Sequence, residues 1–157
     1  MVTKENIIKS QNKWSEWVVA IGIKFEQNKD YKAFVNKTIG SIYGLEFKKL
    51  LFKPTKASIK QFRSTKKELV SYFVGDDRNF PEDKGFALEP WKEIRFENAS
   101  FVIEKKFGVA MGNYFFKNSS NIEVKVEYTL GYMYTLNGNL KIFLHHSSIP
   151  FKNETIY

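Results

Sequence analysis

The two histidines of the chain are the side chains best suited to acid–base chemistry, and they are neighbours, His145 and His146. They fall in a short β-type run, and consecutive side chains of a strand point to opposite faces of the sheet. The two rings therefore cannot hold one metal ion together. The sequence has no cysteine, which excludes disulfides, thiolate metal sites and a cysteine nucleophile. We predict no metal site.

Hairpin register decides which residues can act with His146. Asn137-Gly138 is the strongest short hairpin signal in the chain, and a two-residue turn there places Thr129 opposite His146. A turn at Ser119-Ser120 would pair Tyr114 with Lys125. A three-residue turn would invert the assignment of faces. One face then carries six polar side chains: Tyr114, Lys125, Glu127, Thr129, His146 and Ser148.

These residues allow two interpretations. Glu127 is a diagonal cross-strand neighbour of His146, and such a pair is either an acid–base couple tuned by burial or a plain buried hydrogen bond. In the catalytic interpretation, Glu127 or His146 takes a proton from a carbon or a hydroxyl, and Tyr114 donates to the developing oxyanion. Thr129, Ser148 and Lys125 would bind the ligand. This chemistry requires no cofactor.

The opposite face of the predicted sheet is apolar and aromatic. An exposed patch of this size is unusual on a monomer, so it predicts a homodimer formed through this face. The residues concerned are Val126, Tyr128, Leu130, Tyr132 and Phe143.

The net charge of +8 comes from one segment. Residues 48–67 contain eight lysines and arginines and no acidic residue, whereas the rest of the chain is balanced. This segment is either a solvated surface or a contact for an anionic partner, which would make the protein a non-catalytic binding or assembly module. Few aromatic residues accompany the lysines, which argues against nucleic acid as the partner.

Apolar residues at helical spacing predict helices over residues 7–25 and 31–43, and a capping box at Thr65–Glu68 predicts a third, short helix ending near Gly75. Short β-type runs follow from Trp91 to Ile149, which indicates an α+β fold in a single domain of residues 1–157. No apolar run is long enough to cross a membrane, and no secretory signal is seen, so a cytoplasmic location is expected.

Four segments carry a resemblance to a known superfamily: residues 51–55 (LFKPT), 110–116 (AMGNYFF), 123–129 (EVKVEYT) and 139–150 (NLKIFLHHSSIP). Together they resemble the nuclear transport factor 2-like superfamily in its SnoaL-like branch, and are similar to the association domain of calcium/calmodulin-dependent protein kinase II. The resemblance covers most of the chain, and its motifs are specific for the fold rather than for an activity.

The resemblance implies a cone, in which a curved antiparallel sheet wraps around the N-terminal helices and encloses a cavity. It also implies dimers formed through the outer face of the sheet. Superfamily enzymes such as ketosteroid isomerase and scytalone dehydratase carry out acid–base chemistry in that cavity. We therefore expect a small-molecule pocket protein, an isomerase, dehydratase or cyclase-like enzyme, with the face of Glu127 and His146 lining the cavity.

Overall fold

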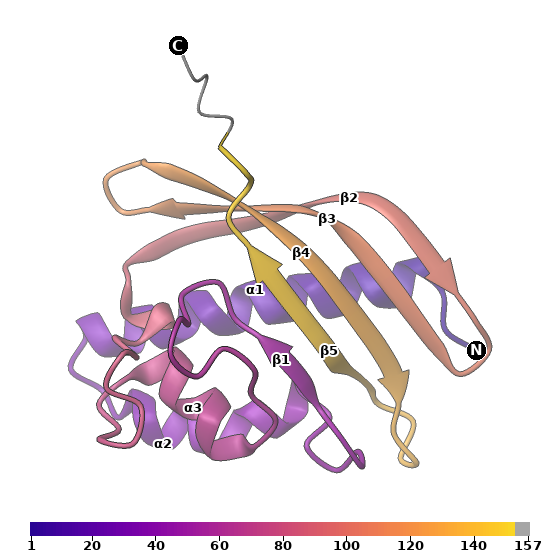
Figure 1. Cartoon of the computed structure of the whole chain (residues 1–157), viewed down its shortest axis with the longest axis horizontal. Coiled ribbons are helices and arrows are strands. Elements are labelled where there is room, and N and C mark those ends of the chain that lie inside the picture. Colours follow the sequence, from indigo (N-terminus) through magenta and orange to yellow (C-terminus); the bar gives the residue numbers. More distant parts are fainter. Residues whose placement is uncertain (153–157) are drawn as a thin grey trace.

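The computed structural model describes residues 1–152, in which the helices come first and a five-stranded sheet follows (Figure 1). The strand order is β1-β5-β4-β3-β2, with β1 parallel to β5 and the other pairs antiparallel. The elements are α1 (Lys4–Glu26), α2 (Tyr31–Thr38), η1 (Ile39–Ser41), β1 (Leu51–Lys53), α3 (Lys66–Val74), η2 (Phe86–Leu88), β2 (Trp91–Ile103), β3 (Phe107–Asn118), β4 (Glu123–Tyr134) and β5 (Leu140–Ser148).

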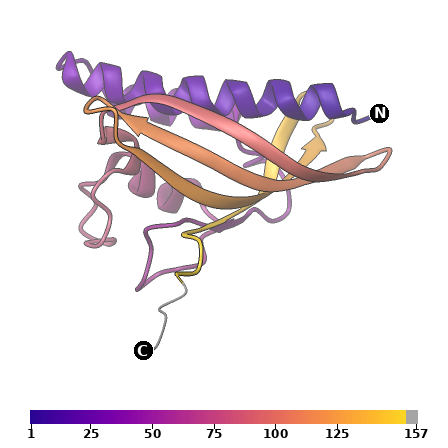
Figure 2. The same ribbon diagram turned by 90° about the horizontal axis from the view of Figure 1, so that it is seen from above.

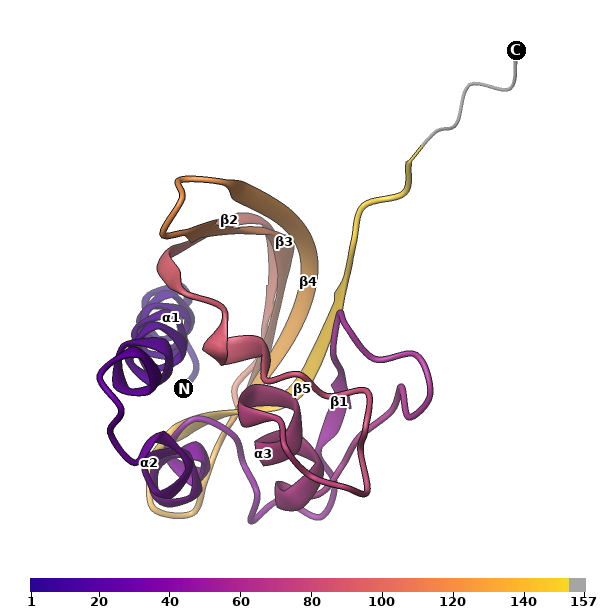
Figure 3. The ribbon, with the colours of Figure 1, turned by 90° about the vertical axis from the view of Figure 1, so that its left-hand side faces the viewer.

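The sheet curves, and the helices lie on its concave side. Figure 2 shows the long helix α1 running beside the twisted strands, and Figure 3 shows β2 to β5 as an arc around the space that the helices occupy. The α+β cone that the sequence predicts is confirmed. No helix among residues 1–152 is long and apolar enough to cross a membrane.

Local signals place the helices close to where the sequence predicts them, although the second ends at Thr38 and only a 3-10 turn follows, to Ser41, short of the predicted residue 43. The Thr3 hydroxyl caps α1 by accepting from the Asn6 amide, and the inward face of this helix carries Trp14, Trp17 and Ile21. The predicted capping box at the start of α3 is formed: Thr65 accepts from the Glu68 amide while the Glu68 carboxylate accepts from the Thr65 amide. Such reciprocal bonds satisfy amide groups that the first turn of a helix leaves free.

The register between β3 and β4 differs from the prediction by one residue. Tyr114 lies opposite Val126, not opposite Lys125. The reason is a three-residue loop. The Asn118 amide donates to the Ile122 carbonyl, the Asn118 side chain accepts from two loop amides, and Asn121 has a left-handed φ of 61°. A shift of one residue moves every side chain of a strand to the other face.

The predicted pairing of Thr129 with His146 is confirmed, although the turn that was expected to set it has a different length. The Thr135 amide donates to the Asn139 carbonyl, which leaves a three-residue loop around Asn137-Gly138. A register shift between Gly131 and Tyr132 then restores the predicted pairing further along the hairpin. One β-bulge therefore compensates for the extra loop residue.

A buried ion pair holds the segment between β1 and α3 against the loop before η2. The Arg63 guanidinium donates to both carboxylate oxygens of Asp83 at 2.6 and 2.7 Å, and the Ser71 hydroxyl also donates to this carboxylate. The neighbouring Glu82 carboxylate accepts from the backbone amides of residues 58–60. These bonds lower the pKa of Glu82 to about 2, and the bond from the Ile59 amide contributes most.

Asp83→Asn should strongly destabilise the fold, because it removes the charge that compensates buried Arg63 while preserving the shape of the side chain. Removing one partner of a buried pair typically costs about 3 kcal/mol or more. Urea unfolding measures this free energy. Asp76→Asn, which breaks the exposed pair with Lys32, is the control and should have little effect. Equal urea midpoints for the two variants would contradict the prediction.

Candidate functional site

A chain of hydrogen-bonded side chains crosses the core on the concave side of the sheet. The indole Nε1 of Trp14, on α1, donates to the Tyr43 hydroxyl at 2.9 Å. That hydroxyl lies 2.9 Å from Nδ1 of His145, on β5, and the Tyr114 hydroxyl, on β3, lies 3.3 Å from Nε2 of the same ring. All four side chains are buried.

Two aliphatic hydroxyls extend this chain. Ser147 lies two residues after His145 on β5, so both side chains point to the concave face. The Thr55 hydroxyl, just after β1, donates to the Ser147 hydroxyl at 2.9 Å. Both hydroxyls, Ser147 buried and Thr55 half-buried, lie near the Tyr114 hydroxyl and lower its pKa. We call these six residues the buried polar cluster: Trp14, Tyr43, Thr55, Tyr114, His145 and Ser147.

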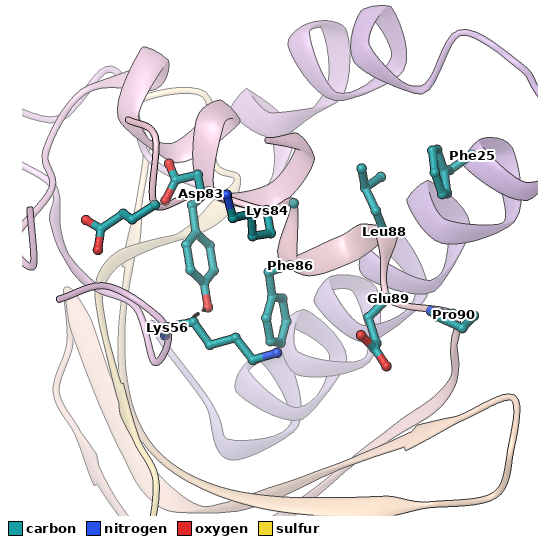
Figure 4. A pocket seen from close by; sticks show the side chains of 11 residues that line it. Phe25, Lys56, Asp83, Lys84, Phe86, Leu88, Glu89 and Pro90 are labelled. Carbon is teal, nitrogen blue, oxygen red and sulfur yellow. Dashed lines mark hydrogen bonds between the residues drawn. The ribbon is translucent and has the colours of Figure 1, made fainter. Parts of the chain in front are cut away.

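A pocket of about 360 Å³ begins one residue after Thr55, although none of the six cluster residues lines it. Lys56, which follows Thr55, lines it together with Tyr72 and Phe86, and the Tyr72 hydroxyl accepts from the Lys56 amide. Figure 4 shows Lys56 beside Phe86, with Asp83 and Lys84 on one side and Leu88, Glu89 and Pro90 on the other. Packed aromatic rings lie between the pocket and the cluster: Phe86 of the pocket contacts Phe116, and Phe116 contacts Tyr114.

Burial keeps the cluster uncharged. Desolvation lowers the pKa of His145 to about 3, with a smaller effect from His146, so its ring is neutral near pH 7. Desolvation also raises the pKa of Tyr114, and the neighbouring hydroxyls of Ser147 and Thr55 lower it by less. The Tyr43 pKa is raised for the same reason. The cluster can therefore offer hydrogen bonds to a small polar molecule, but no formal charge.

Among residues 1–152, no three His, Cys, Asp or Glu side chains come together in a way that could hold a metal ion. The atoms of the cluster that could bind a metal ion belong to neutral hydroxyls and one imidazole. Tyr132, also on the concave face, has the one buried side-chain polar atom in this part of the chain without a hydrogen-bond partner.

The structure brings only one of the predicted site residues into the cluster, Tyr114. Glu127 accepts a hydrogen bond from Ser148 at 3.2 Å, not from His146. The prediction that this face lines the cavity was wrong, because the helices cover the other face. The five remaining residues lie on the convex side of the sheet. A solvent-open hollow of about 390 Å³ there is lined by four of them, Glu127, Thr129, His146 and Ser148, and the fifth, Lys125, lies outside it.

The residues predicted to form a dimer surface are in fact mostly part of the core. Val126, Tyr128, Leu130 and Tyr132 are buried beneath the helices, and Phe143 is half-buried. They cannot form an interface with a second copy without unfolding of the helical layer. The apolar character of this face was predicted correctly, but the protein's own helices cover it.

Sequence reasoning missed five members of the cluster: Trp14, Tyr43, Thr55, His145 and Ser147. Trp14 and Tyr43 belong to helical stripes that indicate a core. The alternation at His145 and Ser147 could have shown that these two polar side chains share a face with Tyr128 and Leu130. A polar pair on an otherwise apolar face is the signal that was available.

The comparisons with known proteins identify the family. A relative from Nostoc sp. (strain PCC 7120), a metal-independent carbonic anhydrase, is 36% identical over 154 residues, which cover 96% of this chain and 75% of the relative. The sequence model of the metal-independent carbonic anhydrase family matches residues 5–149. This chain belongs to that family. The assignment is more specific than the SnoaL-like branch, while the superfamily resemblance is confirmed at the level of fold.

Solved structures agree with the family assignment. A cyanobacterial iota-carbonic anhydrase, crystallised in complex with bicarbonate, matches with a TM-score of 0.93 and 35% identity over 97% of this chain and 94% of that one. A calcium/calmodulin-dependent protein kinase II association domain from Xanthomonas campestris has a TM-score of 0.57 at 16% identity, covering 89% and 83% of the two chains. A nuclear transport factor 2-like protein from Salmonella enterica reaches 0.54 at 10% identity, covering 97% and 94%. The last two show the fold alone.

The family match corrects the functional prediction. An isomerase, dehydratase or cyclase using Glu127 and His146 is not supported, and neither is a non-catalytic module acting through residues 48–67. The structure gives part of the reason for the second correction. Within the basic segment, Arg63 is buried against Asp83, and Lys60 pairs with Glu68. Part of the positive charge therefore serves to hold the fold together.

Burial of His145 should make the fold sensitive to mild acid. Its folded pKa, about 3, lies below the unfolded value of 6.5, so stability is fully present above about pH 6.5 and is lost as the pH falls toward 3. The free energy of unfolding, measured with urea, should be lower at about pH 5 than at about pH 7 by roughly 1–2 kcal/mol because of this residue.

His145→Gln should reduce this pH dependence, whatever its effect on stability at neutral pH. The matched control is His146→Gln, because that ring faces solvent in the folded chain. An undiminished pH dependence in His145→Gln would show that another group is responsible.

Proposed function

We propose that this chain is a carbonic anhydrase that interconverts carbon dioxide and bicarbonate without a bound metal. The observation that carries the proposal is the match to the cyanobacterial iota-carbonic anhydrase crystallised with bicarbonate, which extends over 97% of this chain. The buried polar cluster is the arrangement in this chain that suits the reaction.

The two substrates require different surroundings, and the site offers both. Carbon dioxide is uncharged and apolar, so the part of the pocket lined by Tyr72 and Phe86 suits it. Bicarbonate has oxygens that accept hydrogen bonds, and the hydroxyls of Thr55, Tyr114 and Ser147 can supply these bonds. Lys53 donates to the Ser147 carbonyl oxygen at 3.3 Å, which places a positive charge near the end of the cluster.

In the hydration direction, a water oxygen adds to the carbon while negative charge develops on the oxygens of carbon dioxide. Hydroxyl donors held in a water-poor site stabilise this charge, because they need no reorganisation when it appears. One proton must leave the water. His145 is a poor acceptor for it because its pKa is about 3, so the proton passes to solvent or buffer and His145 serves to hold Tyr114.

The activity can be measured by exchange of oxygen-18 between carbon dioxide and water, in buffer treated with a chelator. The wild-type chain should accelerate exchange, and Ser147→Ala and Thr55→Val should each lower kcat/KM by about 10-fold or more. Ser148→Ala, the neighbouring hydroxyl on the convex face, is the matched control and should keep wild-type activity. No acceleration by the wild-type chain, or acceleration only after metal is added, would overturn the proposal.

A homodimer stays a proposal. It would use the outer, convex face of the sheet, as the resemblance implies, but not the residues predicted for it, which lie mostly in the core. On the convex face, Met111 is 51% and Leu51 53% exposed, and Phe115 and Leu144 are half-buried. Light scattering at micromolar concentration should give the mass of two copies, and Met111→Glu should shift it toward one. A wild-type mass of one copy would rule this dimer out.

A further inference from the structure

We infer that Tyr43, itself held by Trp14, is a positioning residue that fixes His145 in the tautomer protonated at Nε2. In this tautomer the Tyr114 hydroxyl is left to donate a hydrogen bond to a ligand in the site. The inference rests on the proposed function for what Tyr114 acts upon. The direction of the hydrogen bonds itself follows from the geometry of the cluster.

The first step is the direction of the bond between Trp14 and Tyr43. An indole N–H can only donate, so Trp14 Nε1 donates to the Tyr43 oxygen across the 2.9 Å that separates them. The Tyr43 side chain is fully buried, and its own O–H must also find an acceptor.

The second step is the acceptor for that O–H. The other hydrogen-bond partner of the Tyr43 hydroxyl among the described residues is Nδ1 of His145, at 2.9 Å. If Nδ1 carried a proton, both groups would point hydrogens at each other, or the Tyr43 O–H would be left buried without a partner. The latter typically costs about 1–3 kcal/mol. Tyr43 therefore donates, and Nδ1 accepts.

The third step fixes the rest of the chain. A neutral imidazole carries one N–H, and with Nδ1 acting as an acceptor this N–H is at Nε2. It points to the Tyr114 oxygen, 3.3 Å away. Tyr114 thus has its own O–H free to donate to an acceptor other than His145. Donation runs in one direction, from Trp14 on α1 through Tyr43 and His145 to Tyr114 on β3.

This direction determines what the site recognises. A Tyr114 that donates will hold an oxygen with lone pairs, such as an oxygen of bicarbonate or one that gains charge as carbon dioxide is hydrated. With the opposite tautomer, Tyr114 would donate to His145 and could only accept from the ligand. Tyr43 therefore affects the reaction through two intervening groups, without touching the substrate.

The tautomer can be measured directly on the full chain with nitrogen-15-labelled histidine, because protonated and unprotonated ring nitrogens resonate far apart in two-bond proton–nitrogen spectra. His146→Gln removes the signals of the other histidine and assigns the spectrum. We expect the Nε2–H form of His145 in the wild-type chain. A wild-type ring protonated at Nδ1 would overturn the inference, and this measurement needs no change near the site.

Two conservative variants separate positioning from packing. In Tyr43→Phe, nothing any longer opposes the Nδ1–H form, so this form should appear and kcat/KM should fall about 3- to 10-fold, as expected for one lost neutral hydrogen bond. In Tyr114→Phe, Tyr43 still donates to Nδ1, so the Nε2–H form should persist even though activity is lost.

A single unchanged tautomer in Tyr43→Phe would show that Tyr43 has no positioning role. The readouts also separate this inference from the proposed function. If the tautomer is as expected but the wild-type chain does not exchange oxygen, only the proposed function fails. If the wild-type chain is active but protonated at Nδ1, only the positioning role fails.

Discussion

A neutral polar group inside an apolar core needs a hydrogen-bond partner, and this constraint ties distant parts of the chain together. The polar groups of the buried polar cluster satisfy one another, and they come from five separate segments: Trp14 from α1, Tyr43 after η1, Thr55 after β1, Tyr114 from β3, and His145 with Ser147 from β5. Each of these segments must keep its place for the others to remain paired. The cluster thereby links the helical layer to two strands of the sheet, β3 and β5, and to the segment after β1. The low dielectric that makes each bond necessary also makes it effective on a bound anion.

The fold was predictable because its signals are local or repeat along the chain. Helical stripes, the Thr65–Glu68 capping box and the alternating runs after Trp91 are enough to indicate an α+β fold, and the resemblance to the superfamily implied that its sheet forms a cone. The register was only partly predictable. The Asn118 side chain and the left-handed Asn121 set a three-residue loop, and this conformation decides on which face Tyr114 lies. A two-residue and a three-residue loop at such a position differ little in free energy, and sequence patterns do not resolve so small a difference.

The candidate site was harder to predict because its residues look like ordinary core. Trp14 and Tyr43 are aromatic, and only their single polar atoms show that they belong to a network. Of two adjacent histidines, the sequence favoured His146 because a carboxylate lay across from it on the same face. The structure instead places His145 under the helices, where burial rather than a neighbouring charge controls its protonation. Which face the helices cover depends on tertiary packing, so hairpin parity alone could not distinguish the inside of the cone from the outside.

The same cone occurs in proteins that are 10–16% identical to this chain, so the frame itself does not determine the chemistry. The chemistry depends on the few side chains that point inward near the end of β5. For the interconversion of a neutral molecule and a monoanion, an uncharged cluster has an advantage. A buried carboxylate would repel bicarbonate, and a buried cation would bind it more tightly than the neutral substrate and slow its release. Hydroxyl dipoles bind bicarbonate less tightly than a buried cation would, and they still stabilise the charge that forms as carbon dioxide is hydrated.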